Sequence, residues 1–229
     1  YRPVWRKPLS VNVFGFTIYG MPPPSSGGAA VLGALRFLES FAEPAVTFAD
    51  TLFQHRIVEA FQHVFSIRLS LSDPDYNSKT VQDAVDDLVS NDYMTYLAQH
   101  VYSDDTIQPL SKYGGTKWAQ LLDDDDSSAA AAGNVTDAHE GDRRRRSLRE
   151  FGYLQDGGTS HFNIVDEHGN AIAMTTSINT NFGSHIMGSS GIVFSNTMHD
   201  FACPGAPDHY GLRPAPSNFI QPTKRPLSS

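Results

Sequence analysis

DGGTSHFNIVDEHGNAIAMTTSINTNFGS, residues 156–184, is the stretch that decides the fold of this chain. Two strand-like runs, 159–166 and 171–178, are rich in β-branched and apolar residues, and they flank the loop Glu167-His168-Gly169. A three-residue loop that ends in glycine is typical of a β-hairpin, because glycine readily adopts the left-handed conformation that closes the turn. The stretch therefore predicts an antiparallel hairpin.

The loop length determines which residues face one another across this hairpin. Counting outward from residues 166 and 170 places Thr159 opposite Ser177. Facing residues project from the same side of a sheet and side chains alternate along each strand, so Thr159, Ser177 and Asn179 are expected to share one face. A two-residue loop would instead put Ile178 opposite Thr159 and disperse this polar group.

The rest of the chain combines helices with further short strands. Runs of β-branched and aromatic residues predict strands over 14–20 and 191–196. Apolar spacing predicts helices over 28–40, 51–69 and 79–98. Ser25 or Ser26 can cap the first helix, and Asn91-Asp92 can interrupt the last. Helices followed by strands, without a repeated βαβ unit, indicate an α+β fold.

Composition excludes several classes of protein. The 229 residues are 40% hydrophobic, enough for a sizeable core, and their net charge of −8 argues against nucleic acid as the main partner. Cys203 is the single cysteine, so an internal disulfide is impossible, and no zinc-ligand spacing surrounds it. No apolar run approaches the ~18 residues of a membrane-spanning helix, and no signal peptide is visible. Neither a metal nor another cofactor is predicted.

A segment of biased composition precedes the hairpin. Residues 119–152 contain an acidic block and the basic block RRRR, 143–146, around a run of small residues. Such a segment buries little apolar surface, so we expect a disordered insert or a surface loop. The triplet NVT, 134–136, is a glycosylation acceptor if the chain is exported. The basic block is open to three readings: a processing site, an electrostatic tether or a solvated linker.

Thr159 follows two glycines, and this arrangement suggests a chemistry. A threonine hydroxyl is a weak nucleophile, but at a chain terminus the free α-amine can take its proton. Gly157-Gly158 leaves the preceding carbonyl open to attack by the Thr159 hydroxyl, which would cut the chain and release that amine. From these residues alone, an ordinary glycine turn before a strand is the simpler explanation.

Several motifs in one order resemble the γ-glutamyltranspeptidase family. Residues 156–184 resemble the start of that family's small subunit, as do the segments SGIVFSNTMHDF and APSNFIQPTKRPLSS further along. The segments YGMPPPSSGG and HRIVEAFQHVFSIRLSLSDPDY resemble its large subunit. The resemblance implies the αββα sandwich of N-terminal-nucleophile hydrolases. It also implies autocatalytic cleavage between Gly158 and Thr159, with 1–158 as the end of a large subunit and 159–229 as the start of a small catalytic subunit.

The resemblance also implies roles for individual residues. Thr159 is the nucleophile and Ser177 a hydroxyl that supports it, while Asn179 holds the glutamyl head of the donor. Asp200 pairs with the donor's α-ammonium group. Further expected substrate-binding residues are Ser228 and Ser229, which would hydrogen-bond the α-carboxylate, and Thr197.

Two positions depart from the family pattern. Thr197 stands where the family has Gln or Glu, and His199 stands where it has Asp. A threonine is shorter than either usual residue, so we expect weaker binding of the substrate ammonium. The family's oxyanion-hole glycines are expected beyond Ser229 and its carboxylate-binding arginine before Tyr1.

The activity that the resemblance implies is γ-glutamyl transfer or hydrolysis on glutathione and related donors. The acceptors are water, an amino acid or a peptide, and no cofactor takes part. A heterodimer of large and small subunits is expected after cleavage, in a parent protein that is extracellular or anchored to a membrane. Two alternatives remain: an acylase of the same fold, and a catalytically incomplete relative that acts as a precursor or interaction module.

Overall fold

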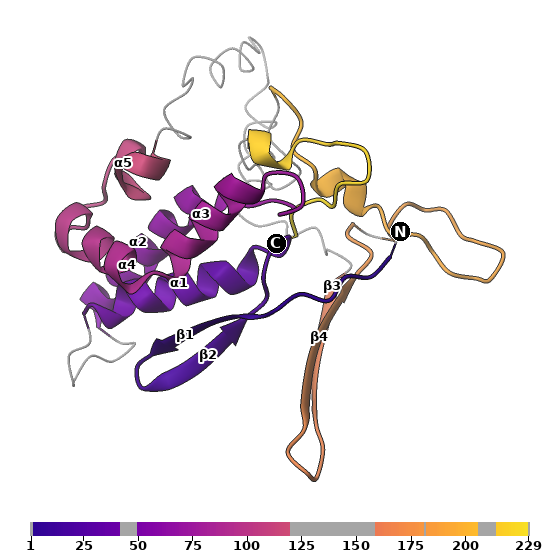
Figure 1. Cartoon of the computed structure of the whole chain (residues 1–229), viewed down its shortest axis with the longest axis horizontal. Helices are drawn as coiled ribbons and strands as arrows, with labels where there is room; N and C mark the ends of the chain where they lie inside the picture. Colours follow the sequence, from indigo (N-terminus) through magenta and orange to yellow (C-terminus); the bar gives the residue numbers. More distant parts are fainter. Residues whose placement is uncertain (1, 42–49, 120–158, 181, 206–213, 229) are drawn as a thin grey trace, which may run out of the picture. The chain divides into compact units, whose positions relative to one another are not determined.

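The computed structural model describes residues 2–41, 50–119, 159–180, 182–205 and 214–228. The chain divides into two compact units, Tyr1–Ala129 together with Asp200–Ser229, and Ala130–His199 (Figure 1). We call them the first and the second unit. Within the described ranges, helices and antiparallel strands both occur, which confirms the α+β class. The described strands form two separate two-stranded sheets.

The first unit begins with a hairpin that the sequence analysis recognised only in part. β1, Leu9–Val13, pairs with β2, Phe16–Gly20. β2 is the strand predicted over 14–20, and it begins two residues later than expected. Phe14 and Gly15 form the turn with φ values of 51° and 80°. A two-residue turn with both φ values positive matches the twist of the paired strands. The run of β1, LSVNV, alternates apolar and polar residues, and this alternation is a signal that could have predicted the strand.

The predicted helices of the first unit are confirmed, with small shifts at their ends. They are α1, Gly27–Glu39, α2, Thr51–Arg68, and α3, Ser78–Val89. The break expected at Asn91-Asp92 falls one residue earlier, at Ser90, whose Oγ accepts a hydrogen bond from the Tyr93 N–H and caps the next helix. The remaining helical segments are α4, Asn91–Tyr96, a π-helical turn, Leu97–Val101, a 3₁₀ turn, Leu110–Lys112, and α5, Gly115–Trp118.

The core of the first unit lies where α1 packs against α2 and α3 (Figure 1). A Cβ atom at Gly33 of α1 would lie 2.9 Å from the Leu88 side chain and 3.3 Å from that of Val64, so glycine lets the three helices approach closely. Leu227, near the end of the chain, belongs to the same cluster. Buried apolar residues of this core include Phe37, Ile67, Leu71, Val85 and Met94.

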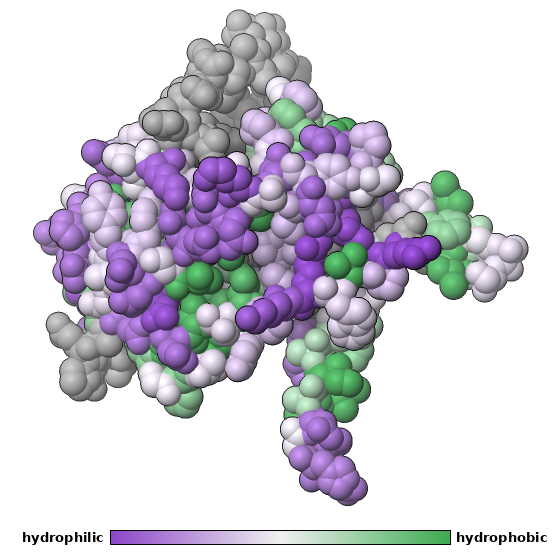
Figure 2. All heavy atoms as spheres, viewed as in Figure 1, coloured by the Kyte–Doolittle hydropathy of each residue, from purple (hydrophilic) through white to green (hydrophobic). Residues whose placement is uncertain are grey.

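The second unit contains the predicted hairpin in the predicted register. β3, Thr159–Val165, and β4, Ala171–Ser177, pair with Thr159 opposite Ser177. Gly169 closes the loop at φ 81°, and its N–H donates to the Asp166 carbonyl. Every residue of both strands is exposed in this structure. Figure 2 shows hydrophobic side chains along the hairpin and hydrophilic ones at its tip.

The strand predicted over 191–196 is wrong. Val193 makes a single isolated bridge with Met187. Gly191 has φ 82°, which turns the chain away from an extended strand. The residues after it continue into a 3₁₀ turn, Thr197–Asp200, and a second such turn, Pro216–Asn218, follows later.

Isolated bridges connect distant segments of the first unit: Ser25 pairs in parallel with Ser228, and Ala202 pairs in parallel with Phe219. Cys203 is an exposed free thiol. Among the described helices, none combines the length and the hydropathy needed to cross a bilayer.

Candidate active site

Two hydroxyl groups meet at the open end of the β3–β4 hairpin. Oγ1 of Thr159 and Oγ of Ser177 lie 2.8 Å apart, within hydrogen-bonding distance. The pairing follows from the loop: Gly169 closes a three-residue turn, and Asp166 accepts hydrogen bonds from the N–H groups of His168 and Asn170. The Asn170 side chain also donates to Asp166, and this hydrogen bond is the main cause that lowers the pKa of that carboxyl group.

The same face of the hairpin continues with a histidine that the sequence analysis did not single out. Nδ1 of His161 lies 2.8 Å from Oγ1 of Thr175, and its Nε2 lies 3.1 Å from Oδ1 of Asn163. His161 is two residues from Thr159, so alternation along the strand places both side chains on one face. That alternation is a signal that could have identified His161 from the sequence.

Asn179 lies beside Ser177 but leaves the strand. It is buried and has φ 72°, a left-handed conformation that asparagine tolerates better than most residues. Its N–H donates to Oγ of Ser177 at 2.9 Å, and its Nδ2 donates to the Asn196 carbonyl at 3.4 Å. Thr159 and Ser177 therefore meet as predicted, whereas Asn179 leaves the strand and contacts Ser177 through its backbone N–H, with its side chain on the Asn196 carbonyl.

Asn196, which was not among the predicted site residues, organises the loop that returns to Asn179. Its Oδ1 accepts from the Thr180 N–H at 3.1 Å, and its Nδ2 donates to Oγ1 of Thr180 at 2.6 Å. Its own N–H donates to the Ile178 carbonyl. These bonds hold the left-handed segment around residue 179 from both sides.

Thr197 and His199 occupy the 3₁₀ turn that ends at Asp200. The Thr197 N–H donates to Oγ of Ser195 at 3.1 Å, and the hydroxyl groups of these two residues are also in contact. The His199 N–H donates to the Asn196 carbonyl, and the residue is exposed. This short turn connects the loop around Asn196 to Asp200.

Asp200 and Ser228, which the resemblance implied as substrate-binding residues, both belong to the first unit. Asp200 is partly buried and Ser228 is exposed. The Asp200 carbonyl accepts a hydrogen bond from Nδ2 of Asn218 at 2.8 Å. Ser229 and Gly158, the other residues implied for the site, lie outside the described residues.

Ser228 is held by the segment that leads into α1. Its N–H donates to the Pro24 carbonyl, and its carbonyl accepts from both the N–H and the Oγ of Ser26, at 2.8 and 2.9 Å. Nε of the buried Arg68 donates to Oγ of Ser26 at 3.0 Å. Ser26 thus stands at the N-cap position of α1, but its side chain does not cap that helix because it bonds Ser228 instead.

A buried carboxylate fixes the chain just before Ser228. Asp73 is fully buried and accepts from the Arg225 N–H at 2.9 Å. The guanidinium groups of Arg6 and Arg225 lie 3.5 and 3.8 Å from its oxygens, which compensates the burial of its charge.

α2 also carries a buried histidine away from these residues. Nδ1 of His63 accepts a hydrogen bond from the Gly114 N–H at 3.0 Å, so the neutral ring carries its proton on Nε2. Burial lowers the pKa of His63 to about 4, because the protonated ring would lose its hydration. Its neighbour Glu59 accepts from the Tyr113 hydroxyl at 2.8 Å.

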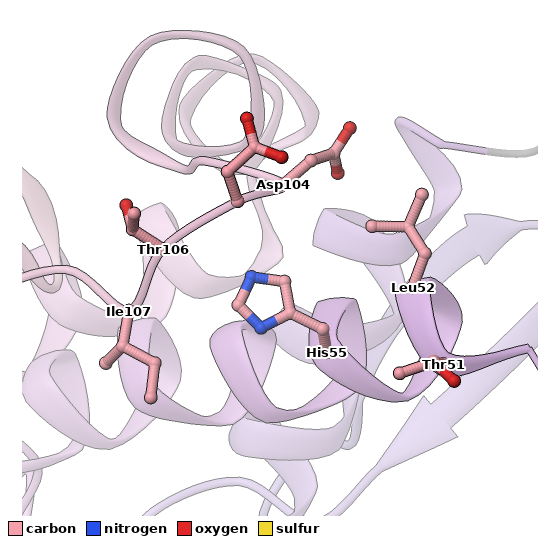
Figure 3. A pocket seen from close by; sticks show the side chains of 7 residues that line it. Thr51, Leu52, His55, Asp104, Thr106 and Ile107 are labelled. Carbon is pink, nitrogen blue, oxygen red and sulfur yellow. The ribbon is translucent and has the colours of Figure 1, made fainter.

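A cavity of about 410 Å³ opens beside α2 (Figure 3). The His55 ring lies between the helix and the loop that carries Asp104, Thr106 and Ile107, and its Nε2 contacts the Ser103 carbonyl. Hydrogen bonds from Arg56 lower the pKa of the Asp104 carboxyl group. None of the predicted site residues lines this cavity. Among the described residues, no group of His, Cys, Asp and Glu side chains is suited to hold a metal ion.

Comparison with known proteins identifies the family. The family model for gamma-glutamyltranspeptidase matches residues 1–229. Glutathione hydrolase 2 of Arabidopsis thaliana is 36% identical over 229 residues, which cover 98% of this chain and 33% of the plant protein. The glutathione hydrolase proenzyme of Escherichia coli K12 is 31% identical over 232 residues, which cover all of this chain and 33% of the bacterial protein. The chain therefore belongs to the γ-glutamyltranspeptidase family.

The chain spans about a third of the length of these relatives. Among solved structures, it is similar to the γ-glutamyltranspeptidase of Helicobacter pylori, with 29% identity, coverage of 46% of this chain and 29% of that one, and a TM-score of 0.42.

Proposed function

We propose that this protein transfers the γ-glutamyl group of glutathione and related donors to water, an amino acid or a peptide, through an ester on Thr159. The observation that carries the proposal is the 2.8 Å contact between Oγ1 of Thr159 and Oγ of Ser177. The Asn179 N–H also donates to the Ser177 oxygen, so the Ser177 hydroxyl is held in place beside the threonine. Membership of the γ-glutamyltranspeptidase family supports the same reaction.

The first step of the proposal is cleavage of the chain. Oγ1 of Thr159 attacks the Gly158 carbonyl carbon, the peptide C–N bond breaks, and the released amine takes up the hydroxyl proton. Water then hydrolyses the resulting ester, which leaves a carboxylate on Gly158 and restores the Thr159 hydroxyl. Glycine at position 158 has no side chain that could shield this carbonyl from attack.

The second step is transfer. The free α-amine of Thr159, with a reference pKa near ~8, takes the proton of Oγ1 as that oxygen attacks the γ-carbonyl carbon of the donor. The amine of the departing group receives this proton as the γ-amide bond breaks. An acceptor amine or water then attacks the glutamyl ester and restores the threonine. Ser177 donates a hydrogen bond to the attacking oxygen and orients it.

The remaining site residues of the proposal recognise the donor. Asn179 holds the glutamyl head, Asp200 pairs with the α-ammonium group, and Ser228 and Ser229 bind the α-carboxylate. Thr197 lines the ammonium side with a shorter side chain than the family pattern has. We further propose that the cleaved pieces form a heterodimer and that the parent protein is extracellular or membrane-anchored, as the family resemblance implies.

Cleavage is tested by denaturing electrophoresis of the full-length protein. Wild-type protein should yield two polypeptides, and N-terminal sequencing should show that the second one begins with Thr159. Thr159→Ala should remain a single polypeptide because the attacking oxygen is gone. A wild-type chain that stays intact while folded would contradict the cleavage step.

Transfer is tested on the cleaved protein by mass spectrometry. Quenching with acid during turnover of glutathione should reveal one glutamyl group on the polypeptide that begins with Thr159. Folded, cleaved protein that releases no glutamate and carries no adduct would support the alternative of a catalytically incomplete relative. An adduct formed only with a different acyl donor would support an acylase of the same fold.

A further inference from the structure

We propose that Asn218 is a positioning residue that sets the separation between Asp200 and Ser228, and through it the affinity for the donor's α-amino acid head. The inference rests on the proposed function, in which Asp200 meets the α-ammonium group and Ser228 the α-carboxylate. It concerns the first unit alone, because all three residues belong to it.

Both polar atoms of the Asn218 amide form hydrogen bonds, one with Asp200 and one with the residue before Ser228. Asp200 and Ser228 are the two proposed partners of the donor's α-amino acid head. Nδ2 donates to the Asp200 carbonyl at 2.8 Å. Oδ1 accepts from the N–H of Leu227, the residue directly before Ser228, at 2.9 Å. Asn218 is only 7% exposed, so water does not easily replace either partner.

The two partners require a side chain with one donor and one acceptor. A backbone carbonyl can only accept and a backbone N–H can only donate, so the orientation of the amide is fixed by its surroundings. An ionised aspartate could accept from Leu227 but would set an oxygen against the Asp200 carbonyl. Leucine, which has a similar volume, would leave both backbone groups without a partner. The chemistry of the site therefore selects an amide.

The backbone around Asn218 is also fixed. Its carbonyl accepts from the Ala202 N–H at 3.1 Å, and Phe219 forms a parallel bridge with Ala202, two residues after Asp200. The ammonium group of Lys224 donates to the Ser217 and Phe219 carbonyls, at 2.7 and 2.9 Å. A fixed backbone lets the side chain act as a spacer of constant length.

Constant length matters because the donor's ammonium and carboxylate groups are attached to one carbon atom. Their protein partners must therefore keep a matched separation, and loss of the spacer should weaken ground-state and transition-state binding alike. Such a loss raises KM and leaves kcat nearly unchanged, because the bond-breaking groups around Thr159 are untouched.

The test compares Asn218→Asp and Asn218→Gln with wild-type protein in the full-length, cleaved enzyme. We expect Asn218→Asp to raise KM for glutathione about tenfold or more with kcat changed by less than about threefold, as loss of one buried hydrogen bond would do. Asn218→Gln keeps donor and acceptor on a longer arm and should give an intermediate KM. The inhibition constant of L-glutamate, which carries the same head, should rise in the same order.

Ser66→Ala is the matched control. Ser66 is buried in the same unit, and its Oγ donates to the Tyr113 carbonyl at 2.8 Å, a hydrogen bond that involves neither Asp200 nor Leu227. This variant should lose comparable stability and keep the wild-type KM. A KM that rises equally in the control, or an Asn218→Asp variant whose kcat falls while KM stays constant, would overturn the inference.

The outcomes also separate this inference from the proposed function. Wild-type protein that neither turns over glutathione nor binds L-glutamate contradicts the proposed function itself. Active wild-type protein with unchanged KM in both Asn218 variants contradicts only the role of Asn218. If Asn218→Asp does not fold, the milder Asn218→Gln decides, and a wild-type KM in that variant overturns the inference.

Discussion

Thr159 and Ser177 lie directly opposite one another at the open end of the β3–β4 hairpin, with their hydroxyl oxygens 2.8 Å apart. Ser177→Ala removes this hydrogen bond and also the acceptor of the Asn179 N–H, while the backbone pairing of the two strands does not depend on the side chain. We expect the rates of cleavage and of glutamyl transfer to fall about 10- to 100-fold, the effect of losing a hydrogen bond worth roughly 1–3 kcal/mol. Ser177→Thr keeps the hydroxyl and should retain most activity. Equal rates in wild type and Ser177→Ala would show that the contact has no role.

Gly169 supports that pairing from the other end of the hairpin. It has φ 81°, and a Cβ there would meet nothing within 4 Å, so Gly169→Ala introduces backbone strain without a clash. We expect a loss of roughly 1–2 kcal/mol of hairpin stability, measured by amide hydrogen exchange along β3 and β4. Gly27→Ala is the matched control, since Gly27 is equally open but has no positive φ. Similar exchange in both variants would contradict this prediction.

His63 should make stability depend on pH. The unfolded chain binds a proton at this residue below its ordinary pKa of 6.5, whereas the folded chain binds it only near pH 4. The unfolded state therefore holds more protons between these values, and the free energy of unfolding falls as pH falls through this window, by on the order of 3 kcal/mol in total.

The measurement is denaturant unfolding at a series of pH values for wild type and His63→Gln. Glutamine can still accept the hydrogen bond from the Gly114 N–H but does not titrate. The difference between the two curves should flatten above pH 6.5 and change steadily down to about pH 4. A difference that is constant across this range would contradict the buried, neutral state of His63.

Ser26 should be important for stability although it does not cap α1. Ser26→Ala removes the donor to the Ser228 carbonyl, in a part-buried hydrogen bond, and the acceptor of the Arg68 Nε–H, in a buried one. We expect a loss of roughly 1–3 kcal/mol in denaturant unfolding. Ser40→Ala, which removes one longer, part-buried contact with Thr95 at 3.3 Å, should cost less. A larger loss of stability in Ser40→Ala than in Ser26→Ala would contradict the importance of the two Ser26 hydrogen bonds.

The local parts of the fold were predictable from sequence because their signals are local. Gly169 and the length of its loop gave the β3–β4 register, and this register brought Thr159 to Ser177. Apolar spacing likewise predicted α1, α2 and α3. The prediction of a strand over 191–196 was wrong. β-Branched residues favour an extended chain only when a partner strand is present, and Gly191, with its positive φ, turns the chain at the start of this segment.

The long-range parts could not be predicted in this way. The contacts of Ser26 with Ser228 and of Asn218 with Asp200 join segments that no periodicity relates. The family resemblance supplied Asp200 and Ser228 as site residues, and those roles remain predictions. It gave no indication of Asn218 or Asn196, whose importance lies in the backbone groups that they bond.

The bridge between Ser25 and Ser228 bears on the cleavage that we propose before Thr159. These residues lie on opposite sides of the bond before Thr159, and Leu227 packs in the same core as α1, α2 and α3. The two polypeptides would thus share one hydrophobic core, and their association would not rest on a surface interface alone. Separating the two polypeptides would require unfolding the first unit. A 159–229 polypeptide made alone would lack the helices α1, α2 and α3 against which its residue Leu227 packs.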